Sequence, residues 1–170
     1  MWTIGTLDLE SRLLLGTAAY ADPETMAAVH VRAQTEMVTL DIRQSNIDVG
    51  RAESFLQYID RSTIEVVPTT AGCLTPDDAV STAHVGAELL ETHWVKLHVA
   101  GCARTWLPDM EGTLEAAREL VREGFHVMPS CVDDPVLCAR LADMGCVAIF
   151  TSAGPSGNGQ ERVRPRHWEV

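Results

Sequence analysis

Trp94-Val95-Lys96-Leu97-His98-Val99 is an apolar stretch that carries two nitrogen bases. Its aliphatic residues favour a buried strand. Because successive side chains of a strand point to opposite faces, Lys96 and His98 share one face and the aliphatic residues share the other. Lys96 is the only lysine among the 170 residues. One side of this predicted strand therefore presents an amine and an imidazole.

Five more apolar runs, each bounded by Gly, Pro, Asp or Ser, predict strands before and after this one. They cover residues 13–16, 37–42, 63–68, 125–129 and 147–151. Helical patterns separate them at residues 22–34, 75–90, 110–122 and 133–144, with a shorter candidate at 51–59. Strands that alternate with helices, and are apolar nearly throughout, are typical of a parallel sheet covered on both faces.

Two α/β architectures fit this order, an open doubly wound sheet and a (β/α) barrel of the TIM-barrel type. Periodicity does not separate them, and six strands are fewer than the eight of a complete barrel. After Phe150 a stretch rich in Gly, Ser and Pro leads into a polar, arginine-rich tail at residues 160–170. We predict one domain over residues 1–170 that ends before a barrel would be complete.

The composition indicates a folded protein with a strong negative charge. Hydrophobic residues make up 46% and charged residues 22%, and the formal net charge is -11. Repulsion from phosphate groups argues against non-specific nucleic-acid binding and against docking on anionic membranes. No apolar run reaches the length of a membrane span, and the first residues do not resemble a signal peptide. We expect a cytoplasmic protein.

The cysteines and histidines show no pattern of metal ligands. The five cysteines are odd in number and contain no C-x-x-C pair, which fits reduced thiols. We expect no metal site and no organic cofactor. The histidines without ligand-like spacing are His30, His84, His93, His126 and His167.

Lys96 is the strongest candidate for chemistry. A lysine removed from water has a lowered pKa, and its free amine attacks carbonyl carbons to form Schiff bases. His98, on the same face, is the candidate proton carrier. The alternative is a lysine at the end of a strand that extends its ammonium to water.

A second candidate site is Gly154-Pro155-Ser156-Gly157-Asn158-Gly159, directly after the last predicted strand. Small residues let backbone N–H groups approach an anion closely, so we predict phosphate contacts from Gly157, Asn158 and Gly159. A purely conformational role of these glycines is the alternative.

Eight different short blocks, spread over nearly the whole chain, resemble in sequence and order those of bacterial thiazole synthase, the enzyme that builds the thiazole phosphate of thiamin. They begin with Ser-Arg-Leu-Leu-Leu-Gly-Thr at 11–17, Pro-Thr-Thr-Ala-Gly-Cys at 68–73 and Trp-Val-Lys-Leu at 94–97. The other five lie at 104–109, 113–117, 123–125, 133–137 and 154–159.

The resemblance implies a (β/α) barrel in which Lys96 forms an imine with 1-deoxy-D-xylulose 5-phosphate or a related ketose phosphate. It implies that a small carrier protein with a C-terminal thiocarboxylate supplies sulfur, that dehydroglycine supplies carbon and nitrogen, and that Gly157 contacts the sugar phosphate. The sequence departs from the family pattern in three ways. His98 stands where the resemblance implies a glutamate, and the residues between the glycines of the glycine-rich loop differ. A seventh and eighth strand, with a catalytic aspartate, are missing.

A sheet that lacks two strands exposes its edges, so we expect a homo-oligomer or a complex with a homologue. Two functions of the protein fit the sequence best. One is a thiazole synthase-like enzyme that uses Lys96, and the other is a non-catalytic homologue that serves as scaffold or partner of a carrier protein or a full-length homologue. A third is a phosphate-binding barrel fragment of unrelated function, in which Lys96 is incidental.

Overall fold

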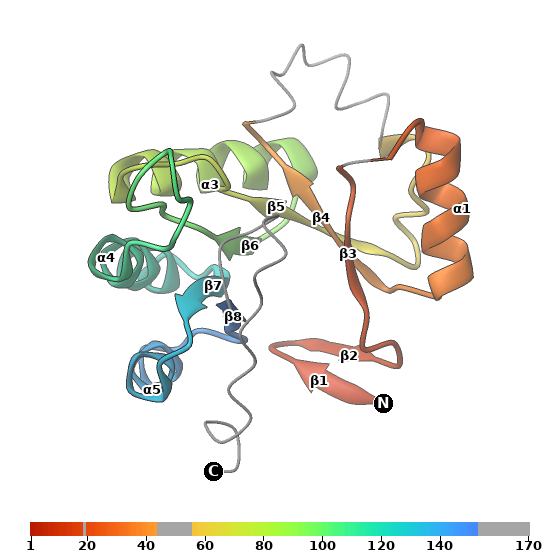
Figure 1. Ribbon diagram of the computed structural model, residues 1–170. Helices are drawn as coiled ribbons and strands as arrows, with labels where there is room; N and C mark the ends of the chain where they lie inside the picture. The colour runs from red at the N-terminus through yellow and green to blue at the C-terminus, as the bar shows by residue number, and fades with distance from the viewer. Residues whose placement is uncertain (19, 44–55, 153–170) are drawn as a thin grey trace.

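The main sheet has six parallel strands in strict sequential order, in a computed structural model that describes residues 1–18, 20–43 and 56–152. The strands are β3 (Leu14–Gly16), β4 (Met37–Asp41), β5 (Glu65–Thr69), β6 (Trp94–Leu97), β7 (His126–Val132) and β8 (Phe150–Ser152). A doubly wound sheet reverses its strand order, and this one does not. The sheet instead curls like part of a (β/α) barrel (Figure 1). The predicted barrel-type α/β fold, with six of eight strands, is confirmed.

Four helices lie on the outer, convex side of the curl (Figure 1): α1 (Pro23–Ala33), α3 (Pro76–Leu90), α4 (Met110–Arg122) and α5 (Pro135–Asp143). Each begins after a residue whose side chain accepts hydrogen bonds from N–H groups of the first turn, which fixes the helix start. These capping residues are Asp22, Thr75, Asp109 and Asp134. The predicted helix at 51–59 falls largely outside the described residues. No helix in the described ranges is long and apolar enough to cross a membrane.

Side chains alternate strictly across the strands and build two apolar layers. On β6 and just after it, Val95, Leu97 and Val99 are fully buried and pack outward in one core with α3 and α4. Trp94 and Met128 point inward and join a second core on the concave side. The outer core therefore anchors β6, and the inner face of β6 can carry polar side chains.

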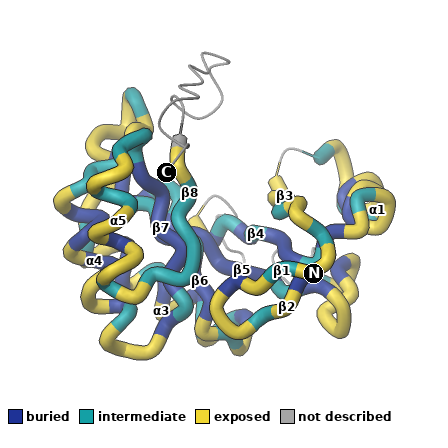
Figure 2. Tube along the Cα trace, turned by 90° about the horizontal axis from the view of Figure 1, so that it is seen from below, coloured by how far each residue is buried: buried dark blue, intermediate teal, exposed yellow. Residues whose placement is uncertain are grey.

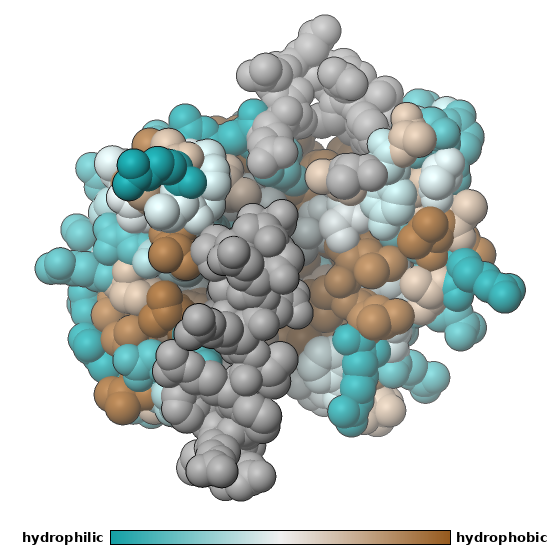
Figure 3. Space-filling view, in the orientation of Figure 1, coloured by the Kyte–Doolittle hydropathy of each residue, from teal (hydrophilic) through white to brown (hydrophobic). Residues whose placement is uncertain are grey.

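A hairpin that the sequence analysis did not predict closes the amino-terminal end of the curl. It consists of β1 (Trp2–Ile4) and β2 (Leu7–Leu9), which pair antiparallel. Ile4 and Leu9 are buried and belong to the inner core. Figure 2 shows strands such as β4 and β7 largely buried and the helices with exposed outer surfaces. In the space-filling view, apolar side chains gather over the β3 region and, on the opposite side of the view, around α4 and α5 (Figure 3).

Gly86 lets α3 approach the sheet closely. A Cβ atom at this position would lie 2.5 Å from Cβ of Pro68 and 3.3 Å from Cγ1 of Ile42. The proline ring is rigid and cannot move aside. This contact sets the distance between α3 and β5.

We expect Gly86→Ala to lower the free energy of unfolding by about 1–2 kcal/mol, because the steric cost exceeds the gain in helix propensity. Urea unfolding followed by circular dichroism measures the change. Gly101→Ala is the matched control, because its Cβ would meet nothing closer than 3.6 Å. Equal stability of Gly86→Ala and wild type would contradict the close packing.

Candidate functional site

Lys96 lies on the concave face of β6, where its ammonium is half-buried. Burial takes the charged group away from water and lowers the pKa of Lys96 from its ordinary value. A lowered pKa increases the fraction of free amine near neutral pH. This is the condition under which a lysine becomes a nucleophile.

Phe150 at the start of β8 covers the Lys96 ammonium. Nζ of Lys96 lies 4.6 Å from the centroid of the ring, within the range of a cation–π contact. The two residues belong to strands separated by β7, so the curl of the sheet brings them together. The ring shields the amine from water, while its π face favours the charged form and so opposes the effect of burial.

His98 follows β6 on the same face and is half-buried as well. Burial lowers the pKa of His98, and the positive charge of Lys96 lowers it further, while a main-chain contact from Trp106 opposes both effects. The imidazole is therefore neutral at pH 7 and can accept a proton. A lysine whose pKa is lowered and a neutral base thus share one wall of the concave side.

The strand register places further polar groups beside Lys96. Asp41 pairs with Thr69, Thr69 pairs with Lys96, and Lys96 pairs with Met128. Paired residues of neighbouring strands point to the same face. One row across the concave side therefore carries a carboxyl, a hydroxyl and an amine. Such a wall suits a polar substrate with a carbonyl group.

The structure places Lys96 and His98 on one face of the sheet, and their chemical roles stay predictions. The predicted phosphate contacts Gly157, Asn158 and Gly159 lie outside the described residues. Two neighbours of the site were not predicted. Phe150 was assigned only to the strand at 147–151. Thr70, whose hydroxyl bonds the backbone of His98, was named only within the block at 68–73.

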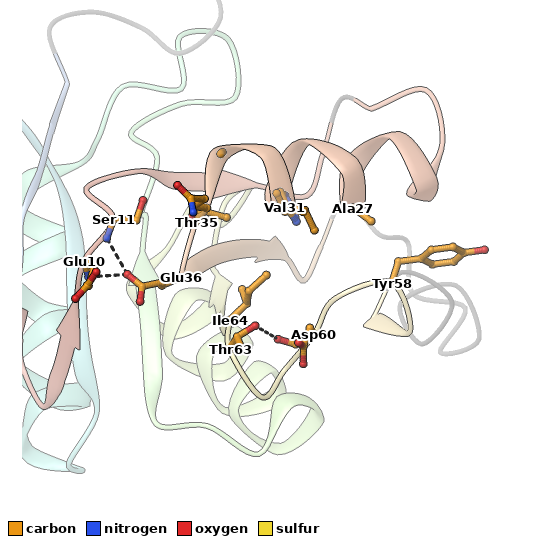
Figure 4. Close-up of a pocket in the computed structure, with 13 residues that line it drawn as sticks. Glu10, Ser11, Ala27, Val31, Thr35, Glu36, Tyr58, Asp60, Thr63 and Ile64 are labelled. Carbon is orange, nitrogen blue, oxygen red and sulfur yellow. Dashed lines mark hydrogen bonds between the residues drawn. The ribbon is translucent and has the colours of Figure 1, made fainter.

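A cleft among the described residues lies elsewhere. It has a volume of about 600 Å³ and lies between the end of α1 and residues 58–64 (Figure 4). Glu10, Glu36 and Asp60 line it. Glu36 is already occupied, because its carboxylate accepts hydrogen bonds from the backbone N–H groups of Glu10 and Ser11. An acidic cleft does not suit a sugar phosphate, so we place the site at Lys96.

A curled parallel sheet with helices outside defines a protein of the (β/α)-barrel class, and the half-buried Lys96 marks its candidate site. Residues 3–169 match the family described as thiazole biosynthesis protein ThiG, and the chain belongs to this family.

Curated relatives agree with this assignment. The chain is 44% identical to the thiazole synthase of Solibacter usitatus over 99% of its own length and 65% of the relative. It is 42% identical to that of Myxococcus xanthus, over 93% of this chain and 60% of the relative. The chain thus spans less than two thirds of these proteins.

Two solved structures resemble the fold of this chain. The crystal structure of the Amycolatopsis orientalis BexX/CysO complex matches with a TM-score of 0.83 and 25% identity, over 97% of this chain and 67% of that one. A putative mandelate racemase from Bordetella bronchiseptica matches with a TM-score of 0.52 and 13% identity, over 82% of this chain and 37% of that one. The second match bears on the fold alone.

We expect Lys96→Met to stabilise the protein by about 1 kcal/mol at pH 7, because an apolar side chain of similar length replaces a charge held away from water. The unfolded chain binds more protons than the folded one between the lowered pKa and 10.5. Wild-type stability therefore rises with pH in that range, and the advantage of the variant shrinks.

Urea unfolding between pH 7 and pH 10 measures both effects. Arg118→Met, which removes an exposed cation from α4, controls for the change in net charge. A Lys96→Met variant that is less stable than wild type, by an amount independent of pH, would contradict the desolvation of Lys96.

Proposed function

We propose that the protein is a thiazole synthase-type enzyme in which Lys96 forms an imine with 1-deoxy-D-xylulose 5-phosphate or a related ketose phosphate. One observation carries this proposal. The only lysine of the chain lies on the concave face of a barrel-type sheet, in a setting that lowers its pKa. Membership of the thiazole biosynthesis family supports the same reaction class.

Imine formation needs a free amine and a way to move protons. The Lys96 nitrogen attacks the ketone carbon, a C–N bond forms, and the resulting carbinolamine loses water to give the imine. His98, neutral at pH 7, accepts the proton that the attacking nitrogen releases and returns it to the departing oxygen. In the same role it can take a proton from the carbon next to the imine. His98 thereby serves where the resemblance implies a glutamate.

Sulfur comes, in this proposal, from a small carrier protein with a C-terminal thiocarboxylate. The similarity to a chain solved as a BexX/CysO complex supports a protein partner of this kind. Gly157, Asn158 and Gly159 bind the sugar phosphate. The protein's net charge of -11 makes local groups necessary for holding an anion.

The second candidate is a homologue that binds the carrier protein without turnover. The residue that favours it is His98, which departs from the glutamate that the resemblance implies. In that case the carrier protein binds while no imine forms at Lys96. The two candidates therefore differ in a covalent product.

Borohydride trapping tests the first candidate. We expect incubation with 1-deoxy-D-xylulose 5-phosphate, followed by reduction, to add one reduced sugar to the intact mass, with peptide mapping to Lys96. Adduct formation should increase with pH from neutrality upward, with a midpoint below 10.5, because the reactive form is the free amine. Lys96→Arg keeps the charge and should give no adduct. A folded wild type without adduct, over several ketose phosphates, would leave the carrier-binding candidate.

His98→Ala should slow adduct formation by about 10²-fold, because the proton carrier is lost while the amine remains. Rates of trapped adduct over time measure this effect. His84→Ala is the matched control, because it removes an exposed imidazole that pairs with Glu123 on the outer surface. Equal rates for both variants would remove His98 from the mechanism.

A further inference from the structure

We propose that Thr70 is a positioning residue for the site: its hydroxyl clamps the backbone of His98 and thereby aims Lys96 and His98 at the concave side. The proposal rests on the function proposed above. Thr70 touches no substrate, and its effect passes through the two bases.

Three hydrogen bonds join Thr70 to the strand that carries the bases. Its backbone N–H donates to the carbonyl of Lys96 at 3.1 Å. Its hydroxyl donates to the carbonyl of His98 at 2.8 Å and accepts from the N–H of His98, also at 2.8 Å. Thr70 is fully buried, so water does not compete for these bonds.

The hydroxyl takes the place of a neighbouring strand. Regular pairing between β5 and β6 registers Thr69 with Lys96, and β6 ends at Leu97. At His98 one side chain satisfies both backbone groups that a paired strand would otherwise satisfy. The next backbone bond between the two segments joins the N–H of Ala100 to the carbonyl of Cys73. Thr70 therefore holds the segment between these two points.

This clamp determines where the two bases point. Side chains alternate about the backbone, so Lys96 and His98 face inward only while residues 96–98 stay extended. Without the hydroxyl, the buried N–H and C=O of His98 lose their partners, and the backbone must move to reach new ones. The movement gives the Lys96 amine access to water.

The test replaces the hydroxyl and reads Lys96 directly. Trace acetylation with acetic anhydride over a range of pH, with mass spectrometry of the peptide that contains Lys96, gives the pH midpoint of its reactivity. We expect the midpoint of Thr70→Val to move up, toward the value of an exposed lysine, and that of Thr70→Ser to match wild type. Imine trapping in Thr70→Val should slow about 10-fold for each pKa unit of that shift.

Thr113→Val is the matched control. Thr113 is also fully buried, and its hydroxyl has no hydrogen-bond partner in the part of the chain that the structure describes. Its replacement removes a buried hydroxyl from α4 that makes no hydrogen bond to the described residues of β6. We expect a wild-type midpoint. A midpoint that stays unchanged in folded Thr70→Val, or that moves equally in Thr113→Val, overturns the proposal.

Acetylation requires no sugar, so this result is independent of whether an imine forms. A wild type that gives no adduct refutes the proposed function. The clamp by Thr70 is then still tested by the pH midpoint of Lys96 acetylation. Should Thr70→Val fail to fold, Thr70→Cys and Thr70→Ser form a second pair that differs by one atom. The weak hydrogen bonds of the thiol predict a raised midpoint in the cysteine variant alone, and equal midpoints in this pair contradict the clamp.

Discussion

The partial burial of one lysine amine is the constraint on which the site depends. Lys96 stays on the concave face because β6 cannot turn over to expose it. Val95 and Leu97 are fully buried on the opposite face, and a flip would exchange them for the charged group. Burial of these side chains contributes about 1.5–3 kcal/mol each, which offsets the cost of partly burying the Lys96 amine.

Most of the fold could be predicted from periodicity, since the six apolar runs became the six parallel strands. Strand ends were less accurate: β7 continues to Val132, because it pairs with β6 up to Pro129 and with β8 from Ser130. The hairpin at the amino terminus was missed, because each of its strands has three residues. Its signal was the alternation on both sides of Gly5, which adopts a positive φ of 54°.

The site could be predicted only in part. The spacing of Lys96 and His98 is a property of one strand and can be read from the sequence. Phe150 and Thr70 act across strands, and their contacts depend on curl and register, which a single sequence does not specify. Two adjacent threonines after a buried run were the visible signal for Thr70. Sequential strand order, which separates a barrel from a doubly wound sheet, likewise emerged only from the structure.

The titration of Lys96 by nuclear magnetic resonance tests the central claim most directly. Because the chain has a single lysine, protein labelled with ¹⁵N-lysine gives one side-chain Nζ signal. We expect a midpoint below the ordinary 10.5 in the folded protein, and a return to the ordinary value in urea. A folded-state midpoint at or above 10.5 would show that the amine is solvated, and would contradict the account of Lys96 as a desolvated nucleophile.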